Sequence, residues 1–211
     1  MHTGLEDHKK EFPKLAAYFA ERAAGEVGLI VTGGIAPSIR GSLLPKPSGL
    51  FNRLQVPRHR LVTSAVHDEG GKICMQILHG GRYSYHPLSV APSAIKSPIT
   101  PFKPRALSAG GVEKQIRKFV RATRLAREAG YDGVEIMGSE GYFINEFTTP
   151  HVNTRTDKWG GSTRNRYRMA EEILSRCREV AGPDFIIIYR LSMLDLIPEG
   201  NSWDEIVEQA K

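Results

Sequence analysis

The sequence predicts an α/β fold in which a parallel sheet forms part of a TIM (β/α)8 barrel. A helix–glycine–strand unit recurs four times, its strands are apolar almost throughout, and polar residues follow every strand. Apolar strands that alternate with helices are typical of a parallel sheet covered on both faces. Open α/β sheets usually bind ligands at one switch point, whereas barrels build sites on the loops after their strands. Polar residues after all four strands therefore favour the barrel.

The four units follow one another at intervals of about fifty residues. Helices are expected over 14–25, 57–71, 112–130 and 165–182, and the strands after them over 27–32, 72–78, 131–137 and 185–191. Glycine ends each helix, where it is expected to supply a left-handed cap. A last helix is expected to begin after Ser202, with Glu205 completing a capping box.

The number of strands indicates an incomplete barrel. Only four strands fit into the chain, and a barrel needs eight. The chain also opens on a helix and closes inside another. We therefore expect residues 1–211 to form a partial barrel domain of a longer polypeptide.

The composition is that of a globular protein: 40% of the 211 residues are hydrophobic and 25% are charged. The net charge is +6, but Lys and Arg are scattered, so a phosphorylated small molecule is at least as good a partner as nucleic acid. No apolar run reaches the length of a membrane span, and the N-terminus does not resemble a signal peptide. Cys74 and Cys177 lie far apart and form no metal-binding spacing, so we expect buried or idle thiols and no metal. Free thiols and an N-terminus unlike a signal peptide suit the reducing cytoplasm, which is the expected location.

Five ordered motifs carry a resemblance to a known family. They are MHTGLED at 1–7, GGIAP at 33–37, QILHGGRYSY at 76–85, AGYDGVEIMGSEGYFINEF at 129–147 and WGGSTRNR at 159–166. Together they resemble the flavin barrel of the bacterial 2,4-dienoyl-CoA reductases, a branch of the old yellow enzyme family. The resemblance implies that the chain supplies about strands 2–5 of an FMN-binding barrel. It also implies FAD, a 4Fe-4S cluster and NADPH in the full-length protein, bound by segments that follow.

Two polar residues in apolar strands are candidate flavin contacts. Gln76 lies inside the strand ICMQIL, where its amide is either satisfied in the core or available to a ring edge rich in amide-like groups. Arg190 ends the strand FIIIYRL, where a buried guanidinium needs a partner such as Asp195, Glu135 or an anionic ligand. The resemblance implies that both residues bind the flavin.

Three further positions match flavin contacts of the family, namely Met1, Thr3 and Gly34. Glycine at position 34 would let the backbone approach a ligand closely, although a plain turn glycine is a fair alternative.

Tyr142 follows a predicted strand on a glycine-flanked loop, MGSEGY. A phenol with a pKa near 10 holds its proton at neutral pH and can donate it. By itself the position suits an ordinary tyrosine at the rim of a site, and the resemblance implies the catalytic proton donor. Glu140 is either an exposed carboxylate or a group that orients this phenol. Met137 and Glu140 replace a His-x-x-His or His-x-x-Asn pair that binds enone carbonyls in many members of the family, which favours the dienoyl-CoA branch.

The segment PHVNTRTDKWGGSTRNR has both a structural and a functional interpretation. Ser162 or Thr163 can cap the helix that follows. The resemblance places His151, Val152, Asn153 and Thr154 along the path of an acyl-CoA, and basic residues nearby suit its phosphates. His79 has no partners at a metal-binding spacing, so we expect it to pack in the interior.

The resemblance implies an NADPH-dependent 2,4-dienoyl-CoA reductase of fatty acid β-oxidation, with hydride from FMN and a proton from Tyr142. Two alternatives remain at this point. One is a stand-alone flavin ene-reductase or a relative of the amine dehydrogenases. The other is an inactive part of a barrel, because half of the strands are missing and the sheet edges would be exposed.

Overall fold

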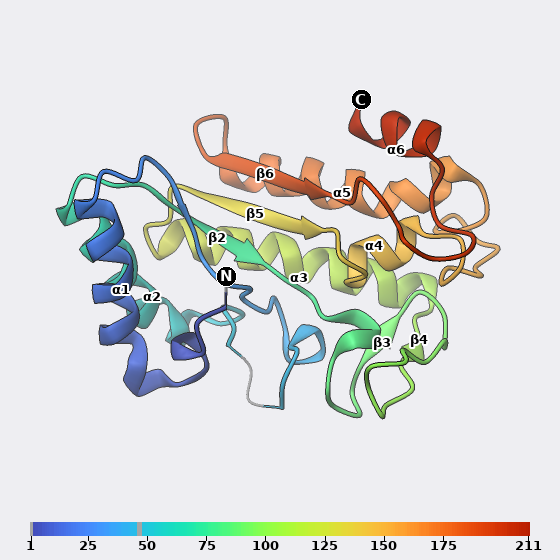
Figure 1. The fold of residues 1–211 in the computed structure, drawn as a ribbon, viewed down its shortest axis with the longest axis horizontal. Coiled ribbons are helices and arrows are strands. Elements are labelled where there is room, and N and C mark those ends of the chain that lie inside the picture. The colour runs from blue at the N-terminus through green and yellow to red at the C-terminus, as the bar shows by residue number, and fades with distance from the viewer. Residues whose placement is uncertain (1, 46–47) are drawn as a thin grey trace.

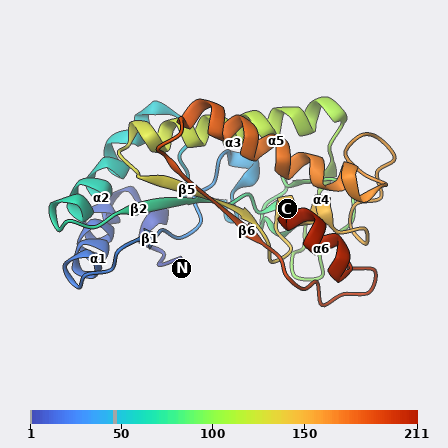
Figure 2. The same cartoon turned by 90° about the horizontal axis from the view of Figure 1, so that it is seen from above.

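The computed structural model describes residues 2–45 and 48–211 and confirms an α/β fold. One sheet of four parallel strands has the order β1-β2-β5-β6, which is also their order along the chain. The strands are β1 (Ile30–Val31), β2 (Ile73–Ile77), β5 (Gly133–Gly138) and β6 (Ile186–Leu191). The sheet curls as half of a barrel does, and helices flank it (Figures 1 and 2).

The helices are α1 (Phe12–Ala24), α2 (Val56–Asp68), α3 (Ala109–Glu128), α4 (Phe143–Thr148), α5 (Thr163–Ala181) and α6 (Trp203–Ala210). Short 3-10 turns span Leu5–Asp7, Lys9–Glu11, Ile39–Gly41, Arg53–Gln55 and Gly81–Tyr83. All four predicted helix–strand units and the last helix are confirmed. The sequence did not predict α4, the 3-10 turns, or the two-stranded sheet of β3 (Val90–Ala91) and β4 (Arg105–Ala106), which lies between β2 and α3 in the chain.

The core lies between the sheet and the long helices α3 and α5. Every residue of β2 and β5 is buried, as expected for strands covered on both faces. The same expectation is wrong for β6, whose residues are half-buried apart from Arg190, which is exposed. The reason is its position: in the described part of the chain β6 pairs only with β5, so it is an edge strand.

The helix ends follow the predicted pattern only in part. Gly70 and Gly130 have φ angles of 75° and 88°, as expected of left-handed caps. After α1 the prediction is wrong, because Gly25 has φ −80° and Glu26 takes the positive φ of 64°. Gly182 has φ 82° and ψ 174°, an extended conformation open almost only to glycine. Ser162 caps α5 and Ser202 caps α6 with Glu205 in a capping box, as predicted.

Both cysteines are buried and unpaired. Among the described residues, no helix combines the length and apolarity needed to cross a membrane.

Candidate functional site

A cavity of about 370 Å³ opens at the carboxyl ends of β2, β5 and β6. Its lining residues are His2, Gly34, Leu43, Gln76, Leu78, Met137, Glu140, Tyr142 and Arg190. Four residues expected to bind the flavin or to donate the proton, Gly34, Gln76, Tyr142 and Arg190, therefore meet at one place. Parallel strands end at the same edge of a sheet, which is why residues so far apart in the chain come together.

Gln76 belongs to the sheet and to the cavity at once. The register of the sheet places it opposite Glu135 on β5, and its side-chain Nε2 donates a hydrogen bond of 2.6 Å to Glu135 Oε1. No hydrogen bond from the described residues reaches Gln76 Oε1. One end of the amide is thus satisfied in the core, and the carbonyl end remains an acceptor at the cavity wall.

Gly34 lies against this amide because the chain after β1 continues beside β2. The Ile35 N–H donates to Gln76 O at 2.8 Å, and the Leu78 N–H donates to Ile35 O at 3.0 Å. A Cβ atom at position 34 would lie 2.7 Å from Leu78 Cδ1 and 3.3 Å from Gln76 Oε1. Only glycine fits here without displacing the wall of the cavity.

Arg190 extends from the edge strand β6, and its Nη2 lies 2.6 Å from Glu140 Oε1. The expectation of a buried arginine paired with Asp195 or Glu135 is wrong. The side chain is 49% exposed and its partner Glu140 is 52% exposed, because the described chain covers β6 on one edge only. An ion pair this exposed contributes little stability, which leaves the guanidinium available to a ligand in the cavity.

The loop after β5 holds Tyr142 in a defined place. Glu140 and Gly141 have φ angles of 62° and 74°, and a Cβ at Gly141 would lie 2.5 Å from the Tyr83 hydroxyl oxygen. The rings of Tyr83 and Tyr142 meet edge to face, with centroids 5.8 Å apart. Burial raises the pKa of the Tyr142 phenol, and the charge of Glu140 and the Tyr83 hydroxyl add to the shift. The phenol is therefore protonated at neutral pH.

The N-terminal residues that line the cavity differ from those expected to contact the flavin. Thr3 does not line the cavity: its N–H and hydroxyl both donate to the Glu6 carboxylate. Its neighbour His2 does line it. Met1 lies outside the described residues. Sequence reasoning did not single out His2, Leu43 or Leu78, since nothing in their local sequence distinguishes them from other residues of those types.

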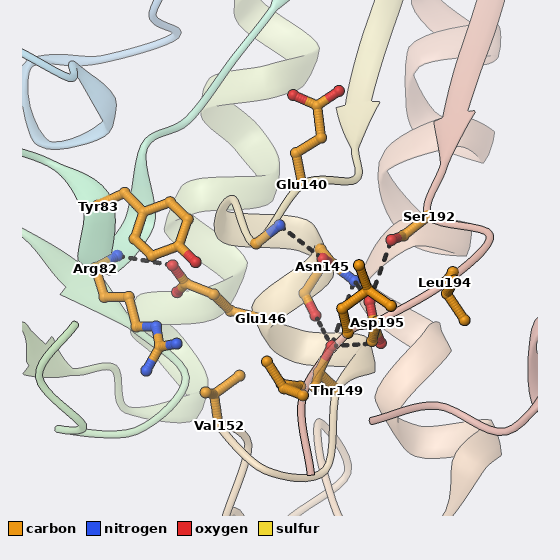
Figure 3. A pocket seen from close by; sticks show the side chains of 13 residues that line it. Arg82, Tyr83, Glu140, Asn145, Glu146, Thr149, Val152, Ser192, Leu194 and Asp195 are labelled. Carbon is orange, nitrogen blue, oxygen red and sulfur yellow. Dashed lines mark hydrogen bonds between the residues drawn. The ribbon is translucent and has the colours of Figure 1, made fainter. Parts of the chain in front are cut away.

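Figure 3 shows a second cavity, of about 230 Å³. It adjoins the first cavity through Glu140, which lines both. Its lining residues include Arg82, Tyr83, Asn145, Glu146, Thr149, Val152, Ser192 and Asp195. Asp195 accepts hydrogen bonds from the side chains of Ser192, Thr149 and Asn201. This network ties the loop after β6 to the end of α4.

Glu146 is an unpredicted feature of this second cavity. It is 1% exposed; its Oε1 accepts from the Arg82 N–H at 2.7 Å, and its Oε2 has no hydrogen-bond partner among the described residues. Burial raises the pKa of this carboxyl to about 8. Its position four residues after Tyr142 in an apolar helical stretch was the signal that could have identified it.

Of the four residues expected along an acyl-CoA path, only Val152 lines this cavity. The Asn153 amide donates to Phe147 O at 2.7 Å and to Trp159 O at 2.8 Å, so it holds its own loop together. Exposed Thr154 donates to Ser93 Oγ at 3.1 Å. The N–H of exposed His151 donates to Glu199 O at 3.3 Å.

His79 packs in the interior, as expected. It is 1% exposed and stacks on Phe143 with ring centroids 3.8 Å apart. Burial lowers the pKa of its imidazole to about 3, so the ring is neutral. Among the described residues, no group of His, Cys, Asp and Glu is arranged to hold a metal ion.

The first cavity has the features that a flavin ring requires. Gln76 Oε1 supplies an acceptor and the Arg190 guanidinium supplies donors, which suits a ring edge that alternates carbonyl oxygens with N–H groups. Leu43, Leu78 and Met137 supply apolar wall, as the flat face of such a ring requires. The residues present fit the expected cofactor.

Comparisons with known proteins agree with this chemistry. The model of the NADH:flavin oxidoreductase / NADH oxidase family matches residues 1–211. An NADPH dehydrogenase of Geobacillus sp. (strain WCH70) is 38% identical over 196 residues, and a metal reductase of Desulforamulus reducens is 35% identical over 202. The matches cover 92% and 94% of this chain, but 57% and 30% of those proteins. The chain thus spans about half the length of one relative and about a third of the other.

Solved structures of three enzymes share the fold. A complex of 2-naphthoyl-CoA reductase with 2-naphthoyl-CoA has a TM-score of 0.88 and 33% identity, over 94% of this chain and 33% of that one. An old yellow enzyme homologue from Zymomonas mobilis has a TM-score of 0.76 and 32% identity, over 84% and 53% of the two chains. Morphinone reductase with tetrahydroNAD has a TM-score of 0.83 and 28% identity, over 93% and 59%.

Proposed function

The chain belongs to the NADH:flavin oxidoreductase / NADH oxidase family, the family of old yellow enzyme. We propose that its protein uses a bound flavin and NADPH to reduce activated carbon–carbon double bonds. The observation that carries the proposal is the meeting of Gln76, Arg190 and Tyr142 on one cavity. It supplies, side by side, groups suited to bind a flavin edge and a phenol that holds a proton.

Gln76 and Arg190 are proposed to hold FMN, with Gly34 allowing the ring to approach the strand. When bound, FMN supplies the hydride chemistry of the reaction. The Glu135 hydrogen bond fixes the Gln76 amide so that its carbonyl oxygen presents an acceptor. The Arg190 guanidinium carries a positive charge and would stabilise negative charge on the cofactor.

Tyr142 is proposed to donate the proton to the substrate carbon. Its raised pKa keeps the phenol protonated, and the glycine loop and Tyr83 hold it at the mouth of the cavity. Proton donation by a positioned side chain typically accelerates a reaction by 10²–10⁴-fold.

The substrate class has two candidates. A stand-alone ene-reductase is supported by the NADPH dehydrogenase, morphinone reductase and Zymomonas mobilis relatives, and it is the proposal that we favour. The narrower candidate is a 2,4-dienoyl-CoA reductase with FAD and a 4Fe-4S cluster. It is supported by the likeness to 2-naphthoyl-CoA reductase, and by Met137 and Glu140 in place of an enone-binding pair.

The test uses the full-length protein and its Tyr142→Phe variant. We expect the variant to keep its flavin absorbance but to lose turnover about 10²-fold or more, because only the hydroxyl is removed. Tyr85→Phe, at an exposed tyrosine outside both cavities, is the control and should retain activity. Turnover of Tyr142→Phe at the wild-type rate would remove Tyr142 from its role.

The absorbance spectrum of the same full-length protein separates the substrate candidates. A spectrum of FMN alone, with reduction of enones by NADPH, supports the ene-reductase. Additional iron–sulfur absorbance, with NADPH oxidation that depends on a dienoyl-CoA, supports the narrower candidate. A colourless full-length protein would contradict both.

A further inference from the structure

A third cavity, of about 630 Å³, lies outside the two already described, between the 3-10 turn Ile39–Gly41 and the start of α3. We name it the basic groove. Its lining residues are Ser38, Ile39, Arg40, Phe51, Arg105, Leu107, Ser108, Gly110, Gly111, Lys114, Gln115, Lys118 and Arg121. The volume is within the range of pockets that bind small molecules and cofactors.

The charge of the basic groove is entirely positive. Five of its residues are cations and none is an Asp or Glu. The cations are Arg40, Arg105, Lys114, Lys118 and Arg121. Among the described residues, none of the five forms an ion pair, and Glu113, next to Lys114 in the chain, instead pairs with Arg176 and Arg117.

The fold gathers these cations from three separate segments. Arg40 follows β1, Arg105 lies on β4, and the other three lie on α3 at spacings of four and three residues. Residues at such spacings share one face of a helix. In the linear sequence these cations appear scattered, which is why composition did not reveal the groove.

Backbone groups at the start of α3 add to this positive potential. The Ser108 side chain accepts from the Gly111 N–H at 3.1 Å, and the amides before Gly111 belong to the first turn, which has no intrahelical acceptors. A Cβ at exposed Gly110 would meet no atom within 4 Å, so the turn is open to a ligand. A helix N-terminus attracts anions, here beside five cations.

We propose that the basic groove binds the phosphates of a nucleotide coenzyme, namely an adenosine pyrophosphate that carries an additional ribose phosphate. Both CoA and NADPH contain this group. Several phosphates spread over a nucleotide match cations spread over three segments better than one phosphate does. Phe51 and exposed Ile39 offer apolar surface to the adenine.

The position of the basic groove suits the proposed function, on which the choice of coenzyme rests. The loop after β1 lines both sites: Arg40 faces the basic groove and Leu43 lines the cavity that holds Gln76. Three residues of extended chain span at most about 11 Å. The linings of the two sites therefore come within about 11 Å of each other along this loop, a separation shorter than a coenzyme.

The test is calorimetric titration of the full-length protein with CoA, dephospho-CoA, NADP+, NAD+ and inorganic pyrophosphate, at low and high salt; the oxidised nicotinamide coenzymes carry the same phosphates as NADPH and NADH but cannot reduce the flavin. The variant is Lys114→Gln with Lys118→Gln. We expect it to bind CoA or NADP+ at least about tenfold more weakly, because two charge-assisted contacts are lost. Wild-type binding should weaken when the ribose phosphate is absent and when salt is raised.

The matched control is Arg124→Gln with Arg127→Gln, which removes the same charge from exposed positions of α3 outside the basic groove. It should bind the coenzymes like the wild type, and circular dichroism checks that both variants fold. The coenzyme whose affinity falls only in the groove variant identifies the source of the phosphates. Equal losses in both variants, no loss in either, or a loss confined to pyrophosphate would overturn the proposal.

This test is independent of catalysis, because it measures binding without turnover. If Tyr142→Phe turned over like the wild type while the groove variant lost coenzyme affinity, the coenzyme site would be supported and the proposed reaction contradicted. If Tyr142→Phe were slow but the groove variant bound coenzymes like the wild type, the proposed reaction would be supported and the coenzyme site contradicted.

Discussion

At the scale of single residues, the cavity depends on close contacts that admit little change. Glu135 and Gln76 are both at least nine-tenths buried and are joined across β2 and β5 by a 2.6 Å hydrogen bond. Removal of one partner would leave the other polar group unsatisfied in the core, at a cost of about 1–3 kcal/mol. Gly34 lies against this pair, and Glu146 lines the second cavity with one oxygen that has no partner among the described residues.

Gly34→Ala is expected to weaken flavin binding and to lower the free energy of unfolding by about 1–3 kcal/mol. The new methyl group would lie 2.7 Å from Leu78 Cδ1 and 2.9 Å from Leu78 Cβ, so the end of β2 must shift. The flavin-to-protein ratio and urea denaturation of the full-length protein measure both effects. Gly28→Ala is the control, because a Cβ there meets nothing within 4 Å. Equal behaviour of the two variants would contradict the prediction.

Glu146→Gln is expected to change how stability depends on pH. The folded-state pKa of about 8 lies above the ordinary value of 4.5, so between these values the folded protein retains a proton that the unfolded chain releases. The Glu146 contribution is therefore fully present below about pH 4.5 and is lost as pH rises through about 8. Glutamine resembles the protonated acid and can still accept from the Arg82 N–H.

Urea denaturation of the full-length protein at pH 5 and pH 8 tests this prediction. The variant should match the wild type at pH 5 and exceed it at pH 8 by roughly 2–5 kcal/mol in free energy of unfolding. A constant difference at both pH values would show that Glu146 does not titrate in this range.

At the scale of elements, the turns after the helices look alike in sequence but differ in conformation. Gly25 follows α1 with φ −80°, which any residue can adopt, whereas Gly182 follows α5 with φ 82° and ψ 174°. The positive φ after α1 is at Glu26, one residue later. Gly25 and Gly182 occupy equivalent positions in two helix–strand units, but only the backbone conformation at Gly182 requires glycine.

Gly182→Ala is expected to lower the free energy of unfolding by about 1–3 kcal/mol, purely through its backbone conformation. A Cβ there would meet no atom within 4 Å, so no clash contributes. Gly25→Ala should be neutral or slightly stabilising, because its φ is ordinary and the unfolded chain loses freedom. Urea denaturation compares the two variants, and a larger loss at Gly25 would contradict this assignment.

At the scale of the whole molecule, the sheet has two edges, at β1 and β6, within the described residues. The chain after β6 also exposes large apolar side chains: Met193, Leu194, Leu196 and Ile197. Such a patch beside an edge strand favours association. The edge position of β6 also explains why Arg190 and its strand are less buried than the apolar sequence of β6 predicts.

Leu194→Ser with Leu196→Ser is expected to reduce self-association of the 211-residue chain. The two leucines are 68% and 86% exposed, so their replacement removes apolar surface without opening the core. Light scattering against concentration measures the effect. Leu54→Ser, at a side chain 92% exposed away from this patch, is the control. The prediction would be wrong if the control reduced association as much as the double variant.

The sequence by itself determined the repeating helix–strand units, the strands that form the core and the edge of the sheet where Gln76 and Tyr142 lie. These features depend on local periodicity, on capping residues and on the rule that parallel strands end together. The serine caps of α5 and α6 were predictable for the same reason, since a cap is made with residues only two or three positions away.

Only the tertiary structure decided the features that depend on distant neighbours. Arg190 is exposed because β6 lies at the edge of the sheet, and Glu146 has a raised pKa because the surrounding chain removes it from water. The five cations of the basic groove lie on three segments, so only folding brings them together, with no carboxylate partner among the described residues. Burial and charge clustering are properties of packed surfaces, and a linear sequence does not specify which surfaces meet.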